Sequence, residues 1–169
     1  MKMQLLLLFL LLGSSFHAQK PSLQEIRLLY QEAESEEKAT ELLLERLESV
    51  GEEQPVLLAY KASGTMLVAK YAFLPFKLSW FNKGKKLMQE AVEAAPEEVE
   101  IRFLRFALQA NTPGFLGYKD HMEEDKALLL KRLPEVKDDN LKQLMLPFLL
   151  NSEYLTETEK QSLSDIKAN

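Results

Sequence analysis

Two arginines and a glutamine on one predicted helix are the residues best placed to bind a ligand. Arg102 and Arg105 are three residues apart and Gln109 follows one turn later, so all three share one helix face. Apolar residues occupy most of the circumference of this segment, which predicts a central, largely buried helix. A buried guanidinium requires a carboxylate. That carboxylate comes either from the chain, as Glu98 or an acid on a neighbouring helix, or from a ligand such as a peptide C-terminus, and Gln109 contributes an amide in both cases.

A second candidate is a basic, aromatic stretch. Between Gln54 and Gln89 the chain has six lysines and no acidic residue, although the whole sequence has a net charge of −5. Lysines interleaved with aromatic residues suit an anionic membrane surface or an anionic ligand. The structural alternative is that the aromatic rings pack between helices and the lysines form a solvated face, attracted to the acidic helices before them. Nucleic acid is not expected as a partner of an acidic protein. The basic aromatic edge that we single out comprises Lys77, Trp80, Lys83, Lys85 and Lys86.

Sequence signals for catalysis or metal binding are weak. His121, Glu124 and Asp125 fall at helical spacing, but without a second nearby histidine they indicate surface charge rather than a metal site. The chain has no cysteine, no Gly-x-Ser-x-Gly elbow, no phosphate-binding loop and no dinucleotide fingerprint. We therefore predict no catalytic residue, metal or cofactor, and no enzyme. A small hydrolase with a concealed carboxylate site is an alternative, because 26 acidic residues make some close pairs inevitable.

The elements that carry these residues are predicted to be helices throughout. Ser22 and Thr156 are suited to cap helices, Gly51 to end one in the left-handed conformation, and Gly64 to allow close approach of a neighbouring helix. Pro55 is expected to open one helix and Pro75 to close it. No useful stretch alternates apolar and polar residues, so the fold class is all-α. About eight helices are predicted, over residues 22–32, 35–50, 55–73, 76–94, 97–110, 120–133, 138–149 and 156–166.

The helices are predicted to pair as hairpins. Pro55, Pro96 and Pro134 recur at intervals of about forty residues, each interval containing two predicted helices. The segment 62–96, with alanines on its second helix and proline just past it, resembles a divergent tetratricopeptide repeat. That resemblance implies a short α-solenoid of stacked antiparallel hairpins whose concave face binds peptides or proteins. An irregular helical bundle is the competing architecture. Residues 100–118 also resemble small, uncharacterised exported helical proteins of Bacteroidetes.

The first residues predict export. Lys2, the apolar run Leu5–Leu12 and the small or polar residues after it form a secretory signal, over residues 1–19, too short to anchor the chain in a membrane. Residues 20–169 then form one domain, in the periplasm or outside the cell and, without a cysteine, not a lipoprotein. The sequence favours a non-enzymatic exported binding or scaffold protein that recognises a protein or peptide partner. A membrane-surface or lipid-interacting accessory protein, using residues 70–86, is the main alternative.

Overall fold

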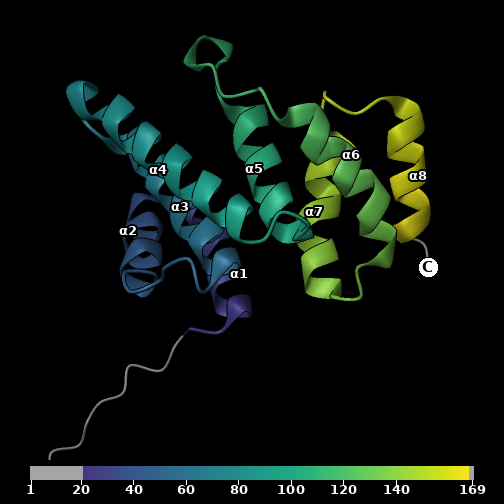
Figure 1. Ribbon diagram of the computed structural model, residues 1–169, viewed down its shortest axis with the longest axis horizontal. Coiled ribbons are helices and arrows are strands. Elements are labelled where there is room, and N and C mark those ends of the chain that lie inside the picture. Colours follow the sequence, from purple (N-terminus) through teal and green to yellow (C-terminus); the bar gives the residue numbers. More distant parts are fainter. Residues whose placement is uncertain (1–20, 168–169) are drawn as a thin grey trace, which may run out of the picture.

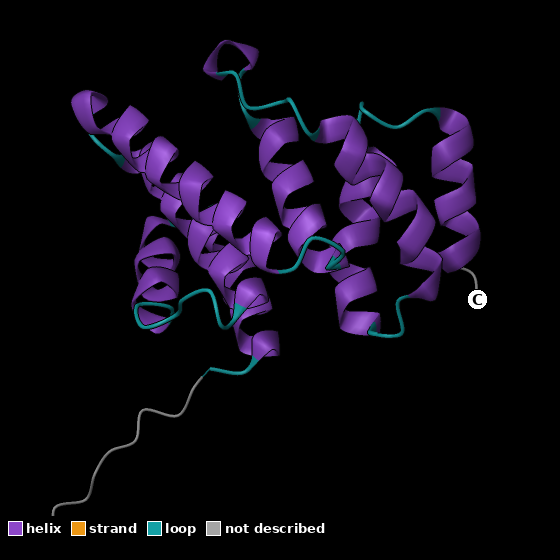
Figure 2. Cartoon of the chain, in the orientation of Figure 1, coloured by secondary structure: helices purple, strands orange, loops and turns teal. Residues whose placement is uncertain are grey.

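A computed structural model describes residues 21–167 as helices joined by short turns (Figure 1). The predicted secretory signal, residues 1–19, lies outside these described residues. No strand occurs between residues 21 and 167 (Figure 2), so the predicted all-α fold class is confirmed. The α-helices are α1 (Leu23–Ala33), α2 (Glu37–Arg46), α3 (Pro55–Tyr71), α4 (Leu74–Ala94), α5 (Val99–Asn111), α6 (Met122–Arg132), α7 (Asp139–Asn151) and α8 (Glu157–Lys167), and two short 3-10 helices are η1 (Gly114–Leu116) and η2 (Leu133–Glu135).

Consecutive helices pack in pairs, as the stacked-hairpin prediction requires. α1 packs on α2, α3 on α4, α5 on α6 and α7 on α8. The hairpins follow one another across the molecule, with α1 to α4 on one side of α5 and α6 to α8 on the other (Figure 1). The proline-bounded intervals contain the α3–α4 and α5–α6 hairpins. No helix within residues 21–167 has the length and apolar character needed to cross a bilayer.

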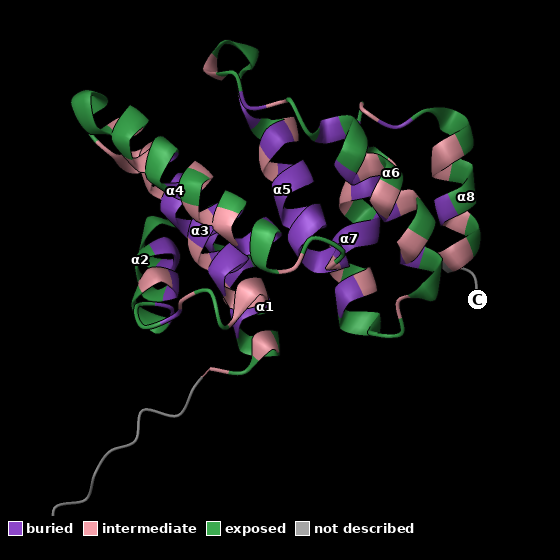
Figure 3. Cartoon of the chain, viewed as in Figure 1, coloured by how far each residue is buried: buried purple, intermediate pink, exposed green. Residues whose placement is uncertain are grey.

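α5 is the central helix of the fold. Ten of its 13 residues are buried, which is why most of its ribbon is coloured as buried in Figure 3. It contacts α3, α4, α6 and α7. Its Ile101, Leu104 and Phe106 are completely buried, and Phe103 and Phe106 both pack edge-to-face against Phe148 of α7. Polar side chains on this helix consequently lie inside the protein and need internal partners.

Three helices begin at the capping or proline residues that the sequence predicted. Ser22 caps α1 in a reciprocal arrangement, in which its hydroxyl accepts from the Glu25 amide at 3.3 Å and the Glu25 carboxylate accepts from the Ser22 amide at 2.8 Å. Thr156 and Glu159 form the same arrangement before α8, at 3.3 and 2.7 Å. Pro55 occupies the first turn of α3, where the missing amide proton costs nothing.

Other predicted ends were wrong. α2 ends at Arg46 rather than Val50, because Leu47 leaves the helical conformation while its side chain and that of Val50 still turn into the core. Gly51 does not take the left-handed conformation, which among the described residues occurs at Gly117 (φ 59°). Pro75 lies in the first turn of α4 instead of closing α3, because a proline is tolerated where no helical amide bond is made.

Two glycines let the helices approach closely. A β-carbon at Gly64 would lie 3.1 Å from Leu43 and 3.2 Å from Leu44, so the predicted close neighbour of Gly64 is α2. At Gly84, a β-carbon would lie 2.8 Å from the carbonyl oxygen of Ala62 and clash with Met66. The two long helices of the α3–α4 hairpin therefore depend on a glycine at their crossing, which the sequence alone did not reveal.

Candidate functional site

The predicted arginine pair forms a buried ion cluster with the next helix. Asp125 of α6 accepts from Arg105 Nε at 2.7 Å and Nη2 at 2.6 Å, and from Arg102 Nη1 at 2.8 Å. The Asp125 side chain is fully buried and both arginine side chains are nearly so. Glu124 also accepts from Arg102 Nη1 at 2.5 Å, and Pro96 O accepts from Arg102 Nε at 2.7 Å. The sequence left open whether the chain or a ligand supplies the carboxylate for these arginines. The structure shows a carboxylate from the chain, and it belongs to α6.

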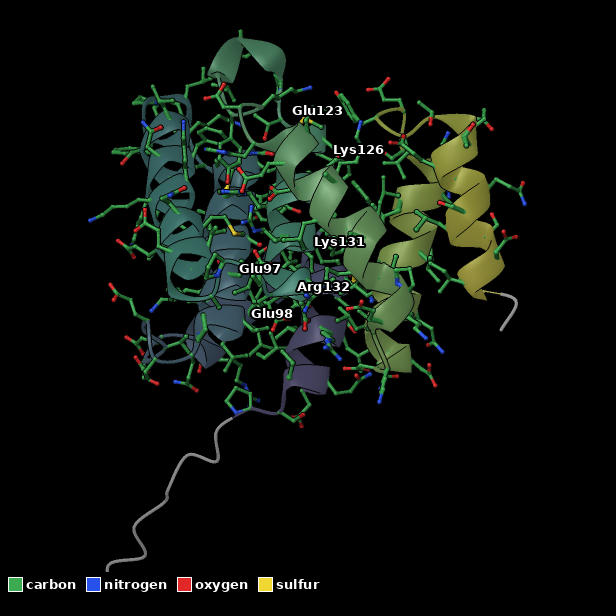
Figure 4. All side chains as sticks on the ribbon, turned by 45° about the vertical axis from the view of Figure 1, so that its right-hand side comes forward. Glu97, Glu98, Glu123, Lys126, Lys131 and Arg132 are labelled. Carbon is green, nitrogen blue, oxygen red and sulfur yellow. The ribbon has the colours of Figure 1, made fainter. Side chains whose placement is uncertain are left out.

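The start of α6 explains why the carboxylates stand there. Glu123, Glu124 and Asp125 lie in its first turn, where the positive end of the helix dipole stabilises negative charge, and Lys131 and Arg132 lie in its last turn. Figure 4 shows Glu123 and Lys126 toward one end of α6, with Lys131 and Arg132 toward the other. Because α6 packs on α5, its first turn meets the arginines.

Arg102 and Glu124 of this cluster shift each other's pKa. Burial alone would lower the pKa of Arg102, but hydrogen bonds to Asp125 and Glu124 raise it overall. The hydrogen bond from Arg102 lowers the pKa of Glu124. Glu98, the other predicted partner, instead accepts from the Glu100 amide at the start of its own helix. Arg102 is thus fixed in the charged form, and hydrogen bonds to α6 hold both arginines in place.

A cleft of about 490 Å³ lies beside this cluster, between α4, α5 and the loop before α6. Its volume is in the range that accommodates a small molecule or a few residues of a peptide. The two helices meet at the turn after Ala94 and diverge toward the far end of α4 (Figure 1). The lining residues are Asn82, Lys85, Lys86, Gln89, Glu90 and Glu93 from α4, Arg105 and Gln109 from α5, and Tyr118, Asp120 and His121 from the loop.

Gln109 is the unusual residue of this cleft. Its side chain is fully buried, yet neither its amide nitrogen nor its amide oxygen has a hydrogen-bond partner within residues 21–167. The hydroxyl of Tyr118, also on the wall of the cleft, is unpaired in the same way, and burial raises the pKa of this phenol. Most buried polar groups in proteins are paired, because each unpaired one costs about 1–3 kcal/mol. Gln109 and Tyr118 both line the cleft, whereas the hydroxyl of Tyr71, which is also buried and unpaired among the described residues, does not.

The structure divides the predicted basic aromatic edge. Lys85 and Lys86 reach the cleft with Arg105 and Gln109. The ammonium of Lys85 lies 5.4 Å from the centre of the Tyr118 ring and donates to Gly117 O at 3.3 Å. The other three members of the edge are absent from the cleft lining: the ammonium of Lys83 lies 5.0 Å from the ring centre of Trp80, and Lys77 lies near the opposite end of α4.

A second buried ion cluster was missed at the sequence level. The Arg27 side chain, which no sequence pattern singled out, is buried and donates to both Glu100 oxygens at 2.7 Å and to Asp138 at 2.7 Å. Tyr60 OH also donates to Glu100 Oε1, at 2.6 Å. Helical spacing alone did not locate it, because Arg27 lies at the edge of the apolar face of α1 and its partners are up to 111 residues away.

His121, Glu124 and Asp125 do not form a metal site in the described part of the chain, where no group of three potential ligands converges. His121 Nδ1 lies 3.2 Å from Glu124, while Asp125 is buried against the arginines and is not the surface charge that the sequence suggested. Cleft residues that the sequence did not single out are Asn82, Gln89, Glu90, Glu93, Tyr118 and Asp120. For Tyr118, its place at the end of a glycine-rich turn was the available signal.

No family model, curated protein or solved structure matches this chain. The resemblance of residues 62–96 to a tetratricopeptide repeat accordingly stays a prediction.

Proposed function

We propose that this protein is a non-enzymatic, exported binding protein that recognises a protein or peptide partner at the cleft between α4 and α5. The observation that carries the proposal is the Gln109 amide, which is buried on the cleft wall with both its donor and its acceptor unpaired among the described residues.

The chemistry of the cleft favours a peptide main chain. A side-chain amide offers one donor and one acceptor close together, which match the C=O and N–H of an extended peptide. The Tyr118 hydroxyl offers a further polar contact. Acidic and basic residues both line the cleft, namely Glu90, Glu93 and Asp120 against Lys85, Lys86 and Arg105, so neither charge sign dominates it. A ligand with neutral polar groups fits this arrangement better than a polyanion.

Arg105 is the residue that would bind a carboxylate of the peptide. Its Nε and Nη2 donate to Asp125, and none of the hydrogen bonds found between residues 21 and 167 uses its Nη1. The Asp125 clamp fixes the guanidinium plane, so Nη1 is held in position without the entropy loss of ordering a free side chain. In this proposal Arg105 binds a peptide carboxylate and Gln109 binds the neighbouring peptide unit, while Arg102 holds α6 in place.

The test is selection from a random peptide library displayed on phage, followed by affinity measurement with the selected peptides. We expect Gln109→Leu to weaken their binding by about tenfold or more, the equivalent of one or two buried hydrogen bonds. Gln143→Leu, at an exposed position on α7, is the matched control and should leave binding unchanged. Selected peptides should also lose affinity when their terminal carboxylate is amidated. Peptides that bind both variants equally would refute the site.

A further inference from the structure

The turn between α3 and α4 exposes an unusual concentration of apolar side chains. Phe73 is 73% exposed, Leu74 76%, Phe76 59% and Leu78 56%. Scattered exposed apolar residues are ordinary on a protein surface, but a contiguous group marks an interaction site. We call Phe73, Leu74, Phe76 and Leu78 the hairpin tip.

The hairpin tip is a projecting, ordered structure. Phe73 caps α4 in the extended conformation, and its carbonyl accepts from the Phe76 amide at 2.9 Å. Pro75 in the first turn fixes the backbone further. The turn lies at the free end of the α3–α4 hairpin, away from α5 to α8 (Figure 1). The tip is therefore a convex surface, which no neighbouring helix of the described chain covers.

Two lysines accompany the tip: Lys77 lies within its sequence, between Phe76 and Leu78, and Lys83 follows on α4. Lys77 follows Leu74 by three residues and donates to Lys70 O at 3.0 Å, so its ammonium lies across the end of α3. Lys83 follows less than two turns later. Lys70 instead turns back and donates to Glu34 O at 2.9 Å. Burial raises the pKa of the Glu34 carboxyl overall, and the charge of Lys70 opposes this shift. Since α3, α4 and the turn between them have no acid before Glu90, the local charge of the tip comes from Lys77 and Lys83.

From this geometry we propose that the hairpin tip docks on an anionic membrane surface. The aromatic and leucine side chains enter the boundary between headgroups and acyl chains, and Lys77 and Lys83 contact lipid phosphates. The first turn of α4 spans about 6 Å along the helix axis, which matches the 5–10 Å depth at which interfacial segments bury their apolar side chains. This function is separate from the peptide cleft, which is lined by residues of α4 from Asn82 onward.

A membrane fits this surface better than a protein partner or a second copy of the chain does. Protein interfaces require a complementary shape, whereas a bilayer accommodates a narrow convex tip. The apolar side chains are exposed at the extremity, the Lys77 ammonium is drawn back to Lys70 O, and Lys83 lies further along α4, which follows the order of layers in an anionic membrane. Within the predicted basic segment 70–86, the residues that contact lipid are then Phe73, Leu74 and Phe76 rather than Trp80, which is half-buried beneath Lys83.

The experiment uses the absence of cysteine from the chain, which allows one introduced cysteine to carry an environment-sensitive fluorophore. The label is placed at Phe76→Cys in one full-length protein and at Leu28→Cys, 52% exposed on α1, in another. We expect vesicles containing phosphatidylglycerol to shift the Phe76→Cys emission to shorter wavelength, more weakly in high salt, and to leave the Leu28→Cys emission unchanged. A change in the Leu28→Cys emission as large as that of Phe76→Cys would show that binding is not specific to the hairpin tip, which would overturn the proposal.

The role of charge is tested with the same labelled protein. Lys77→Gln should weaken the partitioning onto anionic vesicles about fivefold, whereas Lys137→Gln, an exposed lysine far from the tip, should not. Equal partitioning onto phosphatidylcholine vesicles would refute the anionic surface. An emission shift that depends on protein concentration without vesicles would show that the tip binds a second copy, which also overturns the proposal.

Discussion

The two buried ion clusters beside α5 have similar components but differ in how completely they are paired. At Glu100, all three Arg27 guanidinium nitrogens and the Tyr60 hydroxyl have partners. At Asp125, the arginines are also paired, yet Gln109 one turn away is not, and neither is Tyr118. The Glu100 cluster joins α1, α3, α5 and α7, whereas the Asp125 cluster borders an open cleft. Complete pairing indicates a structural role, whereas the unpaired groups beside the cleft are the ones that our proposed binding site uses.

The largest effect is expected where a shared carboxylate is neutralised. Asp125→Asn leaves both arginines with Glu124 alone, which Arg105 approaches only to 3.9 Å, so the free energy of unfolding should fall by about 3–5 kcal/mol. Urea denaturation measures the loss. Glu123→Gln, an exposed neighbour on the same turn, should change it by less than about 0.5 kcal/mol. Similar values for both variants would mean that the cluster contributes nothing to folding.

One substitution made in both regions tests the comparison directly. Tyr60→Phe removes a hydrogen bond to the buried Glu100 carboxylate and should cost about 1.5–3 kcal/mol. Tyr118→Phe removes an unpaired hydroxyl and its desolvation cost, so stability should stay unchanged or rise by up to about 1 kcal/mol. Both are read from urea denaturation of the two variants. The distinction fails if Tyr118→Phe is as destabilising as Tyr60→Phe.

Gln109→Leu should separate stability from binding. Replacing an unpaired buried amide by an apolar group of similar size removes its desolvation cost, so we expect the protein to become more stable by up to about 1 kcal/mol. The same variant should lose peptide affinity. Thermal unfolding and peptide titration of one preparation provide both readings, and a clear loss of stability would assign Gln109 to the core instead of the cleft.

The smallest effect is a pH dependence at the edge of the Glu100 cluster. The hydrogen bond from Arg27 lowers the pKa of Asp138 below its ordinary value of 3.8. This carboxyl therefore adds stability above that value, which is lost as the pH falls through the lowered folded-state pKa. Asp138→Asn keeps an acceptor for the start of α7 but removes the titration. Because Asp138 is partly exposed, we expect the acid-induced loss of stability to shrink by less than about 1 kcal/mol, measured by urea denaturation near pH 5 and pH 2.5.

Local patterns in the sequence were enough for the helices and for the position of α5, because apolar spacing, prolines and capping residues act over a few residues. The neighbour of Gly64 was also foreseen. Residues whose role depends on distant partners were not foreseen. Nothing in the sequence near Arg27 indicates that Glu100 and Asp138 will lie beside it. For the candidate site, the sequence identified Arg105 and Gln109. It did not reveal that Asp125 pairs with Arg105 and leaves the Gln109 amide without a partner among the described residues. Such pairings are decided by how the helices pack in the tertiary structure, and the spacing of residues along one helix carries no information about that packing.

The bond from Arg27 to Asp138 has a consequence for how the chain folds during synthesis. In a helical array whose units touch only their neighbours, the first hairpin can fold as soon as it leaves the ribosome. Here the first helix contains a cation whose partners come from the third and fourth hairpins. Such long-range contacts slow folding because a long loop must close before they form. The α1–α2 hairpin should therefore acquire native hydrogen-exchange protection only after the start of α7 has been synthesised.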